Sequence, residues 1–235
     1  MAQLARGNCA RQSRAAERGV AVCLTGLWRA GSDLDRCRSQ FLGSCVPNAT
    51  VFRINSILGS NRSKVQKQQW RQIVLCEERI RKHELHFGVR FARVLRTRPD
   101  TITYPISVSH RLLPNCDNIA WTYRCFWGPS ACSKVQLNDV HMIFSRATFG
   151  RLATPDFAGV TPREGQSVCN FTGATKDYGS FECWLHVQAF RRNISLAWRS
   201  AGDHPSWILH RTSSPEKRQR LSRLNCACAL PVSAR

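Results

Sequence analysis

Apolar residues alternate with polar ones in some segments of the chain and recur at helical spacing in others, which predicts strands interspersed with helices. The clearest helix is predicted over residues 65–87, and Gly88 follows it as a helix-terminating glycine. Its inward face carries Trp70, Ile73, Val74 and Ile80. Further helices are predicted from about residue 146 and over 180–192, with Ser180 as the N-cap. Strands are predicted over residues 20–28, 49–54, 89–98, 119–127, 139–145 and 193–198.

Strands that alternate with helices predict an α/β domain with a mainly parallel sheet, mixed at its edge and flanked by helices. The length of 235 residues suits a single domain. We expect a disordered basic lead over 1–18, the α/β domain over 19–202 and a basic flexible tail over 203–235. The strand–helix–strand connection into residues 89–98 calls for a right-handed crossover and parallel neighbours.

The chain has a formal net charge of +20, yet 43% of its residues are hydrophobic, which is typical of a globular protein. No stretch of about 18 apolar residues occurs in it, so the transmembrane class is excluded, as are collagen and coiled coil. Of its 35 basic residues 29 are Arg, and they are spread along the chain. This charge fits an anionic small ligand or an acidic membrane surface, whereas a nucleic-acid interface is disfavoured because only residues 216–223 form a basic block.

Cysteines and glycosylation sequons both bear on the compartment. The 12 Cys include no C-x-x-C pair, so buried thiols and a few disulfides are expected rather than a zinc site. Disulfides require an oxidising compartment. N-x-S/T sequons mark four candidate glycosylation sites at Asn48, Asn61, Asn170 and Asn193. Together these features favour the lumen of the secretory pathway or Golgi, with a signal anchor expected upstream of Met1. The alternative is that the Arg-rich opening belongs to a transit peptide.

Candidate chemistry is expected where the strands end, because ligands of open α/β sheets bind outside the carboxyl ends of the strands. In the segment RTRPD, Pro99 stops the strand and presents Asp100 just beyond it, while Arg96 and Arg98 share one face. Asp100 is a candidate ligand for a hard divalent cation that bridges phosphates, Arg98 is a candidate to bind phosphate oxygens, and Arg96 is expected to support the site. A purely structural ion pair between Asp100 and either arginine fits the same spacing.

Three more residues are candidates for this site. Arg29 follows the first strand and is expected to share a cleft with Arg98 and Asp100. Glu84 lies fourteen residues after Trp70 on the inward helix face, so we expect it to support the site by pairing with Arg96 or Arg98. Asp139 precedes a strand and is either a second carboxylate of the site or a turn residue.

Five segments, read in order, carry a resemblance to a known family: VAVCLTGLWR, ATVFRI, QQWRQIVLCEERIRKHELHFGVRFARVLRTRPD, NDVHMIFSRATF and FECWLHVQAFRRNIS. They resemble a divergent group of glycosyltransferase-like proteins of algae, plants and other eukaryotes that carry a GT-A-like nucleotide-sugar domain. That family's pattern has an opening strand with G-x-x-R, a helix bearing Gln, Trp, Cys and Glu, a strand ending R-x-R-P-D, and a later N-D-x-x-x-x-x-x-R. The resemblance covers about residues 20–198.

The resemblance implies a GT-A-like fold and transfer of a sugar from a nucleotide-sugar donor to an acceptor, with Mn²⁺ or Mg²⁺ as cofactor. Enzymes of that fold generally hold the metal on a D-x-D-like pair. Here only Asp33 and Asp35 have this spacing, and they fall in a polar loop, so Asp100 would act alone or with Asp139. Three hypotheses follow: an active glycosyltransferase-like enzyme, a catalytically inactive or truncated relative, and a basic nucleic-acid-binding protein.

Overall fold

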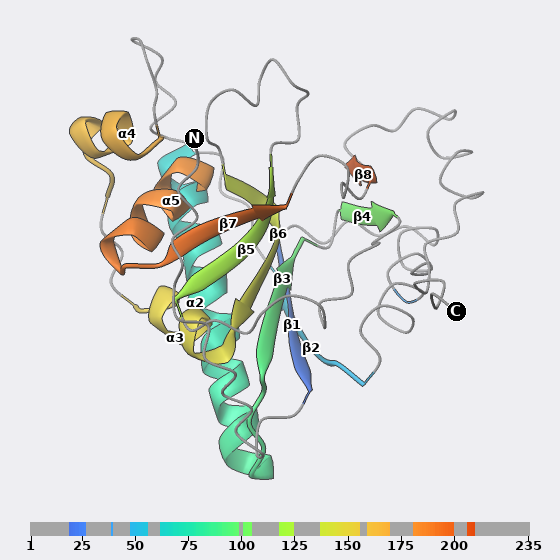
Figure 1. Cartoon of the computed structure of the whole chain (residues 1–235). Coiled ribbons are helices and arrows are strands. Elements are labelled where there is room, and N and C mark those ends of the chain that lie inside the picture. Colours follow the sequence, from blue (N-terminus) through green and yellow to red (C-terminus); the bar gives the residue numbers. More distant parts are fainter. Residues whose placement is uncertain are drawn as a thin grey trace, which may run out of the picture.

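The computed structural model describes residues 19–26, 39, 48–55, 62–98, 101–104, 118–124, 137–155, 159–169, 181–199 and 206–209, and the structural statements below concern these residues. Strands and helices alternate over much of this part of the chain (Figure 1). The strands are β1 (Val20–Gly26), β2 (Thr50–Asn55), β3 (Arg93–Thr97), β4 (Thr101–Tyr104), β5 (Ile119–Arg124), β6 (Leu137–Ser145), β7 (Ser195–Arg199) and β8 (Ser206–Leu209). The helices are α2 (Arg62–Phe87), α3 (Arg146–Leu152), α4 (Pro162–Cys169) and α5 (Phe181–Arg191).

A six-stranded sheet with the order β2-β1-β3-β6-β5-β7 forms the centre of the molecule. β1 pairs in parallel with β2 and β3, and β5 pairs in parallel with β7, whereas β6 is antiparallel to both of its neighbours. Five strands therefore run in one direction, which confirms the predicted α/β class and mostly parallel sheet. The reversed strand is internal, so the expectation of a mixed edge was wrong. β5 and β6 are consecutive strands, and antiparallel pairing between them needs no crossover.

Helix α2 forms where the spacing of apolar residues predicted it. Its inward face is buried against β1 and β2, with Trp70, Ile73, Cys76 and Ile80 each no more than 2% exposed, and Val74 is partly buried. Gly88 follows with φ +62°, a left-handed conformation that glycine adopts without steric cost. The prediction that this helix packs on a sheet containing both β1 and β3 is confirmed. The two strands that α2 connects, β2 and β3, are parallel but are not the predicted neighbours, because β1 lies between them.

The described helices α2, α3 and α5 share one hydrophobic core with the sheet. α2 contacts β1 and β2, while α5 contacts β6 and β7 and also meets α2. The two helices join through Trp70 and Trp184, whose ring centroids are 4.7 Å apart. A disulfide between Cys23 and Cys76 ties β1 to α2 across this layer. α4 packs on the outer side of α5 rather than on the sheet, with Val160 and Val168 against Cys183 and Val187.

Three elements were not predicted: β4, α4 and β8. β4 and β8 pair with each other as a separate antiparallel ribbon (Figure 1). Each has only four residues, too few for a period to stand out. β8 lies within the segment 203–235 that was expected to be a flexible tail, so this segment contains at least one strand.

Candidate functional site

The carboxyl ends of β1 and β3 lie side by side. The two strands are parallel neighbours, and Leu24 is paired with Thr97 in their register. β1 ends two residues later at Gly26, and Arg98 directly follows β3. Arg98 is half-buried and takes part in an interaction within the protein. Arg29 and Asp100 lie outside the described residues. The structure therefore shows only the ends of β1 and β3, the strands that precede these two residues in the sequence.

The reversed strand β6 reaches the same edge with its first residues. Thr97, the last residue of β3, is paired with His141. Asp139 comes two residues earlier in β6, and because the strands are antiparallel its backbone lies past the end of β3. Sequence position alone could not show this, because it depends on the direction of β6. Asp139 is therefore a strand residue rather than a turn residue, and its role as a second carboxylate of the site stays a prediction because Asp100 lies outside the described residues.

Arg96 lies on the helix-covered face of β3, beneath this edge. It is 1% exposed, and its Nε donates a hydrogen bond of 3.1 Å to Oγ1 of the buried Thr25 on β1. Its guanidinium carbon is 5.4 Å from the ring centroid of Phe181 in α5. Arg96 therefore joins β1, β3 and α5 and fits the predicted supporting role, while direct contact of its side chain with a solvent-borne ligand is blocked by burial.

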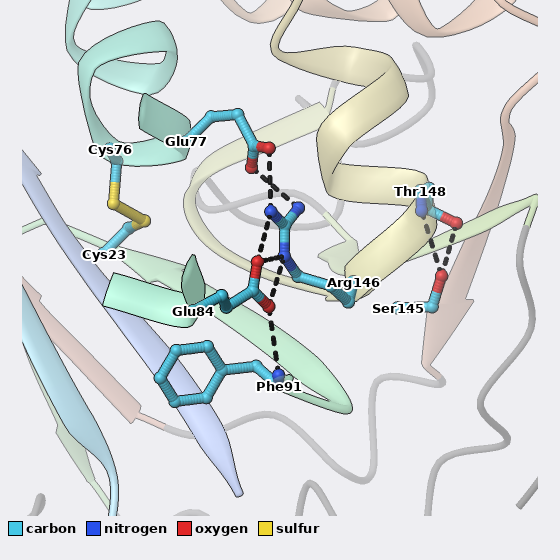
Figure 2. Close-up of polar contacts among 8 residues, drawn as sticks. All are labelled: Cys23, Cys76, Glu77, Glu84, Phe91, Ser145, Arg146 and Thr148. Carbon is cyan, nitrogen blue, oxygen red and sulfur yellow. Dashed lines mark hydrogen bonds and ion pairs between the residues drawn. A yellow bond between two sulfur atoms is a disulfide. The ribbon is translucent and has the colours of Figure 1, made fainter. Parts of the chain in front are cut away.

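Glu84 does not pair with Arg96 or Arg98, so that prediction was wrong. Its carboxylate accepts hydrogen bonds from Nε of Arg146, at 2.9 and 3.0 Å, and from Nη2, at 2.8 Å (Figure 2). It also accepts a 3.0 Å bond from the backbone N–H of Phe91. The reason that Glu84 does not reach Arg96 or Arg98 is the direction in which α2 runs relative to the strands. α2 connects β2 to β3, which both run with β1, so the helix ends where β3 begins, far from the end of β3 where Arg98 lies.

Glu77 and Glu84 hold Arg146 between them, and we call these three residues the arginine clamp. Arg146 donates from Nη1 and Nη2 to the carboxylate of Glu77 at 2.8 and 2.9 Å (Figure 2). The glutamates are seven residues apart, which places them on the same face of α2. Arg146 is the first residue of α3 and follows β6 directly, so the clamp fastens the end of β6 to α2. Ser145 caps α3 by accepting a 3.0 Å bond from the N–H of Thr148.

Burial sets the electrostatics of the clamp. Desolvation raises the pKa of Glu77, although the charge and hydrogen bonds of Arg146 work in the opposite direction. Burial also acts to lower the pKa of Arg146, but its bonds to Glu84 and Glu77 outweigh this and raise it. A shallow cavity of about 390 Å³ adjoins the clamp and is lined by Arg81, Glu84, Leu85, Val89, Arg90, Arg146, Ala147 and Gly150. Because all three charges of the clamp are paired with one another, its role is structural: it holds α3 and the end of β6 to α2.

Arg146 was not singled out from the sequence as a partner of Glu84. The signal was present, because Arg146 is the last residue of the N-D-x-x-x-x-x-x-R pattern and Glu84 belongs to the helix pattern of the same resemblance. The helix segment and the N-D-x-x-x-x-x-x-R segment are therefore in contact through Glu84 and Arg146. Another of its helix residues, Cys76, forms the disulfide to Cys23 in the opening strand.

Two of the four sequon asparagines are described, and both are exposed. Asn48 precedes β2 with φ +65°, and Asn193 precedes β7 with φ +52°. Asparagine tolerates this left-handed conformation better than most residues. Asn61 and Asn170 lie outside the described residues. The expectation of disulfides is confirmed by the Cys23–Cys76 bond, and Cys183 is disulfide-bonded as well.

In the described part of the chain, no group of three or more His, Cys, Asp or Glu side chains could hold a metal ion. No helix among the described residues is long and apolar enough to cross a bilayer. Comparison of the chain with protein-family models and with curated proteins found no match.

Proposed function

We propose that this chain is a glycosyltransferase-like protein with a GT-A-like domain that binds a nucleotide-sugar at the carboxyl edge of its sheet and transfers the sugar to an acceptor. The observation that carries the proposal is the parallel pairing of β1 and β3. Arg29 is the third residue after β1 and Asp100 the third after β3. Three residues span at most about 10 Å, so both side chains are tethered close to one edge.

Each proposed residue has a separate task. Arg29 and Arg98 bind the diphosphate oxygens through charge-assisted hydrogen bonds and so stabilise the charge that develops on the leaving group. Asp100, together with Asp139 at the start of β6, offers the hard carboxylate oxygens that Mn²⁺ or Mg²⁺ prefers. A cation bound there would neutralise the diphosphate as a Lewis acid. Arg96 fixes the end of β3 beneath the site through Thr25.

The proposed location is the lumen of the secretory pathway or Golgi. The disulfides of Cys23 and Cys183 support it, because such bonds persist in oxidising compartments. The exposed sequons at Asn48 and Asn193 fit the same location.

Calorimetric titration with UDP and GDP, each with and without Mn²⁺, tests the proposal. We expect metal-dependent binding by the wild-type chain and its loss in Asp100→Ala. Glu164→Gln serves as a matched control because its carboxylate is on α4, away from the sheet. Wild-type affinity in Asp100→Ala would remove Asp100 from the site. No binding of either nucleotide, with or without metal, would contradict the nucleotide-sugar proposal itself.

A catalytically inactive relative is the second candidate, and the missing D-x-D pair at a strand end favours it. The two candidates differ in turnover. An active enzyme should release free nucleoside diphosphate from the donor in the presence of Mn²⁺, by transfer or by slow hydrolysis. An inactive relative should bind the nucleotide and release none.

A further inference from the structure

Helix α5 ends in a tight turn that fixes the conformation of Asn193. The N–H of Ile194 bonds to the carbonyl of Ala189 at 2.9 Å, and the N–H of Asn193 bonds to the carbonyl of Phe190 at 3.0 Å. This pair of hydrogen bonds is the Schellman arrangement, with Asn193 at the left-handed position. Ile194 and Ala189 are both buried in the core, so the turn is anchored there while the side chain of Asn193 stays exposed.

Phe190 is an unusual residue at this turn because its large apolar side chain is 68% exposed. The two arginines that separate it from Asn193 are both engaged elsewhere. Arg191 donates to the carboxylate of Glu164 at 2.8 and 2.7 Å. Arg192 donates to Thr154 and lies 5.7 Å from the ring centroid of Trp70. The turn therefore exposes an aromatic ring and an asparagine, joined by a backbone hydrogen bond, and Arg151 donates to the carbonyl of Asn193 at 3.4 Å.

Asn193 is also the first residue of the sequon Asn193-Ile194-Ser195. We propose that Asn193 carries an N-linked glycan whose first N-acetylglucosamine packs on the ring of Phe190. The apolar C–H face of a sugar ring matches an aromatic face, and such contact would cover the apolar surface that the fold leaves in water. The inference does not depend on the proposed transferase activity.

The modification is an ordinary group transfer. The side-chain amide nitrogen of Asn193 attacks C1 of the reducing-end sugar of a lipid diphosphate-linked oligosaccharide. The N–C1 bond forms, the bond from C1 to the phosphate oxygen breaks, the lipid diphosphate leaves, and the amide gives up one proton to a base. Donor and transferase belong to the secretory pathway, an oxidising compartment consistent with the Cys23–Cys76 disulfide.

The test uses the full chain behind a cleavable signal peptide, secreted from cells that add high-mannose glycans. Mass mapping of peptides before and after peptide-N-glycosidase treatment reports whether Asn193 is occupied. We expect occupancy in the wild type and its absence in Asn193→Gln and Ser195→Ala. A secreted, folded chain with unmodified Asn193 would overturn the proposed site.

The packing on Phe190 has its own readout. An endoglycosidase that leaves only the first N-acetylglucosamine should preserve thermal stability, whereas complete removal of the glycan should lower Tm by about 2–4 °C. In Phe190→Ala the two treatments should give the same Tm, and in Phe190→Tyr the gap should persist. Asn48 is the matched control. It is exposed and left-handed in the sequon Asn48-Ala49-Thr50, and no aromatic residue occurs among the three before it. If the two treatments gave the same difference in Tm in Phe190→Ala as in the wild type, the proposed packing of the sugar on Phe190 would be overturned.

Discussion

Replacing Arg146 by Met removes the central charge of the arginine clamp and leaves a side chain of similar length. The side chains of Arg146, Glu77 and Glu84 are only 10%, 16% and 13% exposed, so the two carboxylates would stay largely desolvated after losing the cation that both contact. Removal of one partner from a buried ion pair typically costs about 3–5 kcal/mol. We expect a loss of this size in the free energy of unfolding, a large part of the roughly 5–15 kcal/mol of a typical domain.

Urea unfolding followed by tryptophan fluorescence measures the loss. The triple variant Arg146→Met/Glu77→Gln/Glu84→Gln should recover part of it, because it removes the unpaired charges. Arg191→Met is the matched control. Its ion pair with Glu164 is more exposed, 27% and 31%, and exposed pairs are worth at most about 1 kcal/mol.

The pH dependence of Arg146→Met gives a second check. Burial already raises the pKa of Glu77, and without Arg146 it should rise further. A carboxyl whose pKa is raised by folding costs stability above that pKa and stops doing so as the pH falls through it. The loss in Arg146→Met should therefore shrink as the pH is lowered from neutral. A loss below about 1 kcal/mol at neutral pH, or no recovery in the triple variant, would refute the reasoning.

Two further predictions concern the disulfide and a partly buried histidine. Cys23→Ala/Cys76→Ala opens a link between residues 53 apart and should cost about 4 kcal/mol in urea unfolding; a cost below about 1 kcal/mol would show that the link adds little. Burial lowers the pKa of His186 from 6.5 to about 4, so between these values the unfolded chain binds more protons and stability should fall, by up to about 3 kcal/mol, as the pH drops. His186→Gln should flatten this part of the stability profile, and an unchanged slope would contradict the assignment.

Helix α2 and the strands around it were predictable because their signals are local. The spacing of Trp70, Ile73 and Ile80 needs nothing outside the helix, and Gly88 marks its end. The strand–helix–strand order was enough to predict that β2 and β3 run parallel in one sheet, but not that β1 lies between them. Sequence alone thus located the strand ends from which the segments of Arg29 and Asp100 start, and the two side chains themselves lie outside the described residues.

The partner of Glu84 was not predicted because it depends on distant parts of the chain. Arg146 is 62 residues away, and the pairing needs both the direction of α2 and the reversed direction of β6. Arg96 and Arg98 were nearer in sequence but lie towards the other end of β3. The β4–β8 ribbon failed to stand out for a related reason, since its two short strands are about a hundred residues apart.

Because β6 is antiparallel to β3, the first residues of the N-D-x-x-x-x-x-x-R pattern lie near the end of β3 and its arginine lies near the start of β3. Asp139 lies near the start of β6 and Arg146 directly follows its end, seven positions later, and the register of β6 against β5 shifts between Leu137 and Met142. Arg146 is held to α2 by the arginine clamp, so the position of Asp139 depends on the length of strand that joins it to Arg146. Inserting or deleting one residue between His141 and Ser145, where β6 pairs regularly with β3, would turn the side chains beyond the change to the opposite face of the sheet. The number of residues between His141 and Arg146 is therefore constrained by strand pairing and by the arginine clamp together.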